Sequence, residues 1–322
     1  MDLVNGSQSE TPPIAEVFDG LREKCGIVGV FSNDFSRQLS LALVVAGGVQ
    51  HRGQQGAGYS SYTRNGVQTY TGSGLLKNVF PDDVINKLNK PSLWSMIHCR
   101  YGTYGDWEPE NIQPCVVKDT FSKEKIVIIH NGQFSDVNGI RSRLRGTFKE
   151  GLSDTYLFGE LLAQTNGDSW EDRICKIVDS VDGAFSLIVG IGKAMYLVRD
   201  RHGLRPFYMG NVKGSIVAAS ETHALDKVNA ENMSEINPGA VIRLDSSGVT
   251  RIRRGSRMNP HFCDLERAYF SRPDSMWLDR YSVRGKMTKK WISFSRFRYD
   301  CGKKMADDVV IKKASFVIGV PD

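Results

Sequence analysis

The chain has 322 residues, of which 40% are hydrophobic and 24% charged, and this composition excludes wholesale disorder. A chain of this length forms one large domain or two ordinary ones and buries a core without disulfides. No apolar run reaches the roughly 18 residues that a membrane-spanning helix needs, and the polar N-terminus lacks the pattern of a secretory signal. The six cysteines form no C-x-x-C pair, which favours a reducing, cytoplasmic compartment.

Charge is distributed unevenly along the chain. Residues 251–322 contain 17 Lys and Arg against 8 Asp and Glu, whereas the first 250 residues contain 25 against 28. A basic tail of this kind can contact phosphates, but no basic motif interleaved with aromatic residues supports nucleic-acid binding. We therefore predict neither a nucleic-acid partner nor a membrane partner.

The first predicted element begins at residue 25. Residues 1–24 are polar and show no period, so they are predicted to form a flexible leader. The run CGIVGVFS (25–32) predicts a buried strand, and QLSLALVVAGGVQ (38–50) predicts a buried helix that ends near Gly47 and Gly48. Further strands are predicted at 95–100, 125–132, 184–190, 194–200, 215–221 and 240–244, and further helices at 136–145, 154–164 and 169–180.

The predicted strands are almost continuously apolar, which indicates sheets that are covered on both faces. Short turns between several of them indicate antiparallel pairing. The sequence therefore predicts an α+β fold with helices outside and antiparallel sheets inside. Residues 284–305 show no clear period, and the chain stops in the apolar run SFVIGVPD, so we expect a last domain that is truncated.

Polar residues lie at the ends of the predicted strands and helices, where sites are commonly built. They are Cys25, His51-Arg52, His98-Cys99-Arg100, His130-Asn131-Gly132 and Ser153-Asp154, with Ser153 as a predicted helix N-cap. Taken singly, each has a plain structural interpretation, since a lone Cys is usually a small buried hydrophobe and Asn-Gly is first a turn signal. The sequence contains no P-loop, zinc-protease or serine-hydrolase motif.

Taken together, these segments match one family. In order and spacing, CGIVGVF, QHRGQQGAG, HCRYGTYG, ENIQP, HNG and SDT resemble the N-terminal-nucleophile glutamine amidotransferases. GAFSL, RDRHGLRPFYMG, ASETHAL, NPGAVIRL and CDLERAYFSRPDSM are similar to the amidophosphoribosyltransferase branch, so that the resemblance covers about residues 25–283. For RDRHGLRPF (199–207) we predict a structural turn fixed by pairs of Arg and carboxylate groups rather than a catalytic role.

The resemblance implies a fold and a division of the chain. The expected fold is the four-layer αββα sandwich of N-terminal-nucleophile hydrolases, followed by the incomplete start of a phosphoribosyltransferase domain. Residues 1–24 then form a leader or propeptide, and residues 25–262 form the class II glutaminase domain. Residues 263–322 form a linker and the truncated beginning of the second domain.

The resemblance also implies the catalytic residues. If residues 1–24 are removed, Cys25 becomes the first residue, and its α-amino group, with a pKa of about 8, can act as base for a thiol of about 8.5. Asn131 and Gly132 match the oxyanion hole of the family. The implied reaction converts glutamine to glutamate and ammonia through a cysteine thioester.

Three further residues match glutamine-binding positions. Arg100 matches the residue that binds the α-carboxylate, in the bidentate geometry that suits arginine. Asp154 matches the carboxylate that pairs with the α-ammonium group, and Arg52 matches a position that lines the same pocket. The implied substrate is free glutamine, bound by both of its charged ends.

In the complete family member, the ammonia forms 5-phosphoribosylamine from phosphoribosyl pyrophosphate, the first step of de novo purine biosynthesis. Asp307-Asp308 is followed by Val-Val-Ile instead of the expected small and hydroxyl residues, so the site for phosphoribosyl pyrophosphate and its Mg²⁺ is predicted to be missing. Some family members hold an iron–sulfur cluster on four cysteines. Only Cys263 matches a ligand here, and we predict no cofactor in this chain.

Two alternatives to an active glutaminase of this branch stay open. The chain can be a non-catalytic truncated paralogue that joins homo-oligomers, or hetero-oligomers with a full-length homologue. It can also belong to another glutaminase-coupled enzyme, such as a glucosamine-phosphate or asparagine synthetase, although the segment YFSRPDS (269–275) argues against this.

Overall fold

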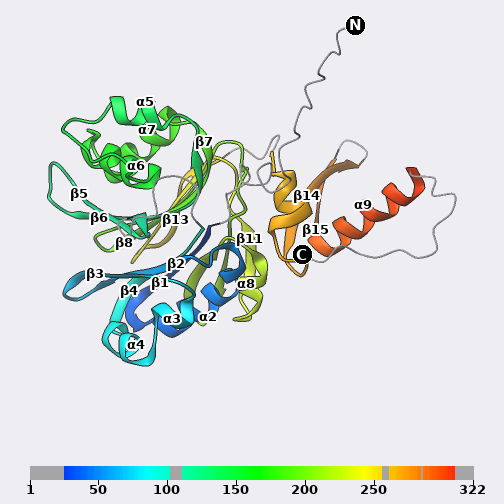
Figure 1. Ribbon diagram of the computed structural model, residues 1–322, viewed down its shortest axis with the longest axis horizontal. Helices are drawn as coiled ribbons and strands as arrows, with labels where there is room; N and C mark the ends of the chain where they lie inside the picture. The colour runs from blue at the N-terminus through cyan, green and yellow to red at the C-terminus, as the bar shows by residue number, and fades with distance from the viewer. Residues whose placement is uncertain (1–24, 102–110, 256–260, 284–285, 309–322) are drawn as a thin grey trace, which may run out of the picture.

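Two antiparallel β-sheets form the centre of the protein (Figure 1). The structure is a computed structural model that describes residues 25–101, 111–255, 261–283 and 286–308. The seven-stranded sheet has, in spatial order, β11 (Glu231–Glu235), β9 (Tyr208–Val212), β10 (Ser215–Ala219), β1 (Gly26–Arg37), β4 (Pro91–Arg100), β2 (Gly56–Thr63) and β3 (Gly66–Ser73). The six-stranded sheet has β13 (Gly248–Arg254), β12 (Ala240–Asp245), β8 (Ala194–Arg199), β7 (Gly183–Ile191), β6 (Lys125–Phe134) and β5 (Cys115–Lys118).

The strands at the centre of each sheet are buried on both faces. In β1, Ile27 and Phe31 belong to the core between the two sheets, whereas Val28 and Val30 belong to the core under the outer helices. Because successive side chains of a strand point to opposite faces, one strand feeds both cores. β6 and β7 divide their apolar side chains in the same way. This double burial explains the continuous apolar runs and confirms the prediction of sheets covered on both faces.

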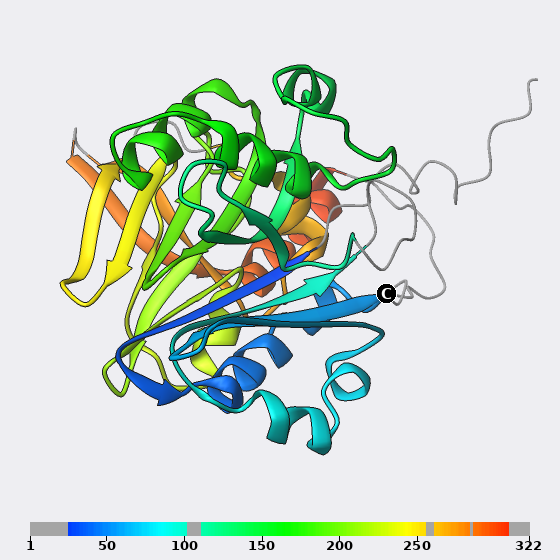
Figure 2. The same cartoon turned by 90° about the vertical axis from the view of Figure 1, so that its left-hand side faces the viewer.

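Helices cover the two outer faces. On the seven-stranded sheet lie α2 (Leu39–Gly47), α3 (Leu76–Val79), α4 (Asp82–Leu88) and α8 (Thr222–Asp226). On the six-stranded sheet lie α5 (Val137–Ser142), α6 (Asp154–Gln164) and α7 (Trp170–Ser180). Figure 2 shows the resulting layers, with the green helices α5–α7 on one side of the stacked sheets and the blue helices on the other. The α+β αββα architecture is as predicted.

The prediction from sequence missed part of the seven-stranded sheet. The predicted strands and helices are all present near their expected positions, but no element was predicted between residues 56 and 88, where β2, β3, α3 and α4 lie. β2 has the sequence GAGYSSYT and is almost fully buried. Its buried positions are largely small or hydroxyl residues, so the strand has no apolar run that would reveal it.

A smaller unit follows the sandwich. It begins with a single π-helical turn, η3 (Glu266–Phe270), and continues as the hairpin of β14 (Met276–Val283) and β15 (Lys286–Ser293). α9 (Phe294–Asp308) follows, and its Phe294 is buried against Trp277 with ring centroids 4.9 Å apart. Since Phe294 is the one buried residue of α9, the helix has no apolar stripe that the sequence could show.

Several predictions fall outside the described residues. The leader 1–24 and the final run SFVIGVPD are among the residues that the structure leaves undescribed. Among the described helices, none combines the length and the apolar character that crossing a membrane requires.

Candidate active site

A small cavity of about 20 Å³ lies where the starts and ends of β1, β4, β6 and α6 come together. β1 pairs with β4 so that Gly26 lies opposite Cys99, which places Cys25 beside Arg100. The cavity is lined by Cys25, His98, Arg100, Tyr101, Gln113, His130, Gly132, Ser153 and Asp154. Four of the six predicted site residues therefore meet in one place, although they come from two different sheets and a helix.

Cys25 directly precedes β1, and its Sγ lies 3.6 Å from the carbonyl oxygen of Tyr101. Burial raises the pKa of this thiol, although the contact with Tyr101 and the charge of Arg100 act in the opposite direction. A thiol with a raised pKa is protonated at neutral pH and needs a base before it can act as a nucleophile.

Gly132 and Asn131 are adjacent on β6, opposite Phe185 and Ser186 of β7. Gly132 has a φ of +136°, and a Cβ at this position would lie 1.8 Å from the carbonyl oxygen of Ala184, so only glycine fits. Asn131 is fully buried, and neither its side-chain oxygen nor its nitrogen has a hydrogen-bond partner among the described residues. Buried amides are normally paired, so the Asn131 side chain still has donors and an acceptor to offer, although Asn131 is not among the residues that line the cavity.

The structure places opposite charges at the cavity. Asp154 is the first residue of α6, and its carboxylate accepts hydrogen bonds from the backbone N–H groups of Thr155 (2.7 Å) and Phe134 (3.2 Å). Burial acts to raise the pKa of Asp154, but His130 and these N–H groups outweigh it, so that the pKa lies below its ordinary value. Arg100, at the end of β4, donates through Nη1 to the carbonyl of Asn111.

Ser153 caps α6 as predicted. Its hydroxyl accepts a hydrogen bond from the backbone N–H of Tyr156 (3.2 Å), and its own N–H donates to the side-chain oxygen of Asn111 (2.8 Å). A cap of this kind fixes the first turn of a helix. The first turn of α6 carries Asp154, so the cap also fixes the position of that carboxylate.

A hydrogen-bond network that the sequence analysis did not identify surrounds these residues. Nε2 of His98 lies 3.1 Å from the carbonyl oxygen of His130, and Nδ1 of His130 lies 3.0 Å from the hydroxyl of Thr155. Gln113 binds both the backbone N–H of His130 (2.6 Å) and the hydroxyl of Thr155 (3.0 Å). Gln113 belongs to the ENIQP segment and Thr155 to SDT. The motifs therefore included both residues, but the sequence did not show that they bind each other and His130.

Arg52 does not line this cavity, contrary to the expectation from sequence. It is fully buried behind the nucleophile, and its Nε donates to the carbonyl oxygen of Cys25 at 3.1 Å. Its other two nitrogens bind the carboxylates of Glu221 (2.7 Å) and Glu266 (2.6 and 3.0 Å). All three nitrogens of the Arg52 guanidinium therefore have partners within the protein, and they hold Arg52 behind Cys25 and outside the cavity wall.

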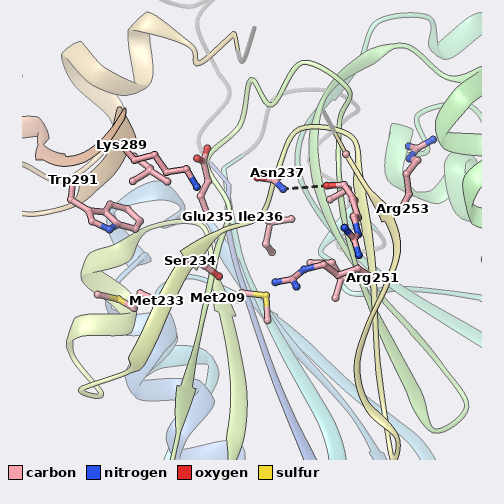
Figure 3. A pocket seen from close by; sticks show the side chains of 15 residues that line it. Met209, Met233, Ser234, Glu235, Ile236, Asn237, Arg251, Arg253, Lys289 and Trp291 are labelled. Atoms are coloured by element: carbon pink, nitrogen blue, oxygen red, sulfur yellow. Dashed lines mark hydrogen bonds between the residues drawn. The ribbon is translucent and has the colours of Figure 1, made fainter. Parts of the chain in front are cut away.

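A larger cavity of about 740 Å³ opens elsewhere, between the edges of the two sheets and β15 (Figure 3). Side chains of Arg251, Lys289 and Trp291 point into or border it, and Met209 and Ile236 form apolar parts of its wall. Its lining contains no cysteine or histidine. Size alone does not make it the candidate for a reaction that needs a nucleophile and a base.

The chain is similar to known glutamine amidotransferases. Residues 100–227 match the family model "Glutamine amidotransferase domain". The chain is 33% identical over 309 residues to the chloroplastic amidophosphoribosyltransferase of Glycine max, covering 94% of this chain and 50% of that protein. It is 28% identical to the amidophosphoribosyltransferase of Bacillus subtilis, over 96% of this chain and 61% of that protein. The structure of the B. subtilis glutamine phosphoribosylpyrophosphate amidotransferase, complexed with ADP and GMP, superposes with a TM-score of 0.75 at 26% identity, covering 89% of this chain and 59% of that one.

Residues 100–227 are therefore similar to a glutamine amidotransferase domain, and most of the chain is similar to amidophosphoribosyltransferases. It spans about half to three-fifths of the length of the curated amidophosphoribosyltransferases named above. The αββα sandwich is the part of the fold that carries the cavity, and the described residues of the matched segment, 100–101 and 111–227, lie in it.

The structure confirms the predicted turn between β8 and β9. The carboxylate of Asp200 accepts hydrogen bonds from the backbone N–H groups of His202 (2.8 Å) and Gly203 (2.7 Å), and Arg199 pairs with Glu235 at 2.8 Å. The segment RDRHGLRPF therefore has the structural role expected of it.

The described residues of the amidotransferase do not fit an iron–sulfur cluster. No three His, Cys, Asp or Glu side chains within the described ranges gather closely enough to hold a metal ion. Cys263, which resembles a first cluster ligand, is half-buried and lacks a set of partner ligands in this part of the chain. We derive no chemical step through such a group.

Proposed function

We propose that this chain is a glutaminase, which hydrolyses glutamine to glutamate and ammonia through a thioester on Cys25. The observation that carries the proposal is the meeting of Cys25, Gly132, Arg100 and Asp154 at one cavity. These four residues supply a nucleophile, an oxyanion donor and a charged residue for each end of a free amino acid, which are the parts that amide hydrolysis of glutamine needs.

The nucleophile is activated by its own residue. Once residues 1–24 are removed, the α-amino group of Cys25 accepts the thiol proton, and Sγ attacks the side-chain carbonyl carbon of glutamine. The tetrahedral intermediate collapses, the C–N bond breaks, and ammonia leaves with the transferred proton. Water then attacks the thioester, which releases glutamate and restores the thiol. While residue 24 remains attached, the nitrogen of Cys25 is an amide and cannot act as this base.

The oxyanion is stabilised by the backbone N–H of Gly132 and the side-chain amide of Asn131. The unpaired, buried amide of Asn131 supports this assignment, since its nitrogen is available to donate when a ligand arrives. One preorganised donor of this kind contributes about 3–4 kcal/mol to the barrier reduction.

The substrate is held by its two charged ends. Arg100 binds the α-carboxylate, and Asp154 binds the α-ammonium group. The lowered pKa of Asp154 supports this role because it keeps the carboxylate ionised at neutral pH. The cavity has a volume of only about 20 Å³, so the lining side chains must move apart when glutamine enters.

In a complete amidophosphoribosyltransferase, we propose, the released ammonia forms 5-phosphoribosylamine from phosphoribosyl pyrophosphate at the start of purine biosynthesis. The described residues supply the glutaminase half of this reaction and need no cofactor for it. We further propose a cytoplasmic protein that forms homo-oligomers, or hetero-oligomers with a full-length homologue. Transfer of the ammonia to another acceptor, such as a sugar phosphate of a different pathway, would overturn the assignment to this branch.

The test is the intact mass of the purified protein before and after reaction with 6-diazo-5-oxo-norleucine, an electrophilic glutamine analogue. We expect a chain that begins at Cys25, a single adduct on it, and loss of that adduct and of ammonia release in Cys25→Ala. Cys175→Ala is the matched control, because Cys175 is a half-buried thiol on α7, outside the cavity lining, with a pKa that burial also raises, and it should keep both signals.

A second result of the same experiment would contradict the glutaminase proposal. If a chain that begins at Cys25 forms no adduct and releases no ammonia from glutamine, the glutaminase proposal is wrong. The non-catalytic partner then becomes the better interpretation, and co-purification with a full-length homologue becomes the measurement to make.

A further inference from the structure

Behind the nucleophile lies a buried cluster of charges that the glutaminase mechanism does not use directly. Arg52 is at its centre, and the side chains of Arg52, Glu221 and Glu266 are all at most 1% exposed. Glu221 follows β10 in the seven-stranded sheet, whereas Glu266 begins the π-helical turn η3 beyond the sandwich. Through Arg52, the cluster therefore connects the smaller C-terminal unit to Cys25.

Each carboxylate is held by at least one further group of the C-terminal unit, and Glu266 also by one of the sandwich. Glu266 accepts a hydrogen bond from the hydroxyl of Ser271 (3.1 Å) and lies 3.6 Å from Nη1 of Arg205. Glu221 accepts hydrogen bonds from the hydroxyl of Ser275 (2.7 Å) and the backbone N–H of Arg272 (3.0 Å). The segment from Glu266 to Ser275 is thus fixed against the sandwich by polar contacts that converge on Arg52.

Stability alone does not explain this arrangement. Burying several charges costs free energy that their attraction only partly offsets, and apolar replacements of similar volume are often as stable. A buried ion pair also holds its side chains in one orientation. Here the fixed atom is Nε of Arg52, which lies 3.1 Å from the carbonyl oxygen of Cys25.

We propose that Glu266 is a positioning residue for the nucleophile, because it holds Arg52 in the orientation that binds the carbonyl oxygen of Cys25. The inference rests on the proposed glutaminase function. The hydrogen bond to this carbonyl restricts rotation about the bond between Cα and C of Cys25. That rotation decides where the amino group and Sγ point relative to Gly132 and Asn131.

The proposal also moves the end of the glutaminase domain beyond residue 262. The residues after 262 were predicted to be a linker, but Glu266, Ser271 and Ser275 complete the support of the active site. Residues 263–275 then belong to the glutaminase unit, and displacement of this short segment lowers turnover without touching the glutamine-binding residues. Single π-helical turns such as η3 are frequent at functional sites.

The test uses the chain beginning at Cys25 and the variants Glu266→Gln and Ser271→Ala. Misplacing a reacting group by about 1 Å can cost about 100-fold in rate, so we expect kcat for glutamine hydrolysis to fall at least about 10-fold in Glu266→Gln. KM should stay within about twofold, since Arg100 and Asp154 are unchanged. Ser271→Ala, a milder change, should lower kcat in the same direction, and Glu266→Asp should recover part of the loss.

Asp119→Asn is the matched control. It removes the carboxylate of another buried ion pair, with Arg173, on the helix-covered side of the six-stranded sheet, and it should lower the melting temperature while kcat stays within about twofold. If Glu266→Gln and Ser271→Ala lose stability but keep the parental kcat, Glu266 is only structural and the proposal is wrong. If Glu266→Gln does not fold, the kcat of Ser271→Ala and Glu266→Asp decides. An inactive parental chain would instead refute the glutaminase itself.

Discussion

His98 links the strand beside the nucleophile to the other sheet, and burial fixes its protonation state. It lies on β4 opposite Ile27, and its Nε2 donates to the carbonyl of His130 on β6. Burial, with a further contribution from Arg100, lowers the pKa of His98 to about 3. The ring is therefore neutral, with its proton on Nε2, and Nδ1 has no partner among the described residues.

This shift makes the stability of the folded protein dependent on pH. Between pH 6.5 and about 3, the unfolded chain binds a proton at His98 and the folded chain does not. The free energy of unfolding therefore falls as the pH falls through this window, by about 1.4 kcal/mol per pH unit for one proton. We expect His98→Gln to show a shallower slope than the parental protein in chemical denaturation at pH 6.5, 5.5 and 4.5.

The exposed residue His261 supplies the comparison. His261→Gln removes an exposed histidine and leaves the buried hydrogen bond between the sheets unchanged, so it controls for the loss of a histidine as such. Equal slopes for His98→Gln and the parental protein would mean that His98 is already protonated in the folded state or exposed by local opening.

Among the secondary-structure elements, α6 connects local folding to substrate binding most directly. Ser153 caps its N-terminus, the next residue is Asp154, and both line the cavity. α7 offers a matched helix of the same length, because Ser169 caps it by accepting from the N–H of Asp172. The two caps have similar chemistry, but only the first lies beside the site.

The two caps can be compared directly. Ser153→Ala and Ser169→Ala should each lower the free energy of unfolding by about 1 kcal/mol. Only Ser153→Ala should also raise KM for glutamine several-fold, because the first turn of α6 then holds Asp154 less firmly. Steady-state kinetics and denaturation of both variants test this. An equal KM for the two variants would show that Asp154 is positioned without the cap.

The same elements show what can be predicted from sequence. β1, β6 and β7 were found because burial on both faces leaves continuous apolar runs, and the start of α6 agrees with the predicted cap at Ser153. β2 was missed because its buried positions, apart from Tyr59, are Gly, Ala, Ser and Thr, and its place in the sheet comes from pairing with β3 and β4. In the site, Cys25, Gly132 and Asp154 stand in motifs at strand and helix ends. The partnership of Arg52 with Glu266 was not predictable, since 214 positions separate the two residues and only the tertiary fold brings them together.

At the scale of the whole molecule, the candidate site depends on how the two sheets are stacked. Cys25 and Arg100 come from the seven-stranded sheet, whereas Gly132 comes from the six-stranded sheet. Trp94 of β4 spans the space between them, since its ring packs at Gly190 of β7 and its Nε1 donates to the carbonyl of Gly192 at 2.9 Å. The spacing of the sheets therefore sets the distance between the nucleophile and the oxyanion donors.

Gly190→Ala tests this dependence. The added Cβ would lie 2.5 Å from the Trp94 ring, so the ring or the sheet must shift, and overpacking of this kind typically costs about 1–3 kcal/mol of stability. Because a shift between the sheets separates Cys25 from Gly132, we expect kcat for glutamine to fall more than KM changes. Gly47→Ala, at the exposed end of α2 with nothing within 4 Å of the new Cβ, should keep the parental kcat and be equally or slightly more stable. A Gly190→Ala protein that is destabilised but has the parental kcat would show that the site tolerates movement between the sheets, and its geometry would then be determined within each sheet separately.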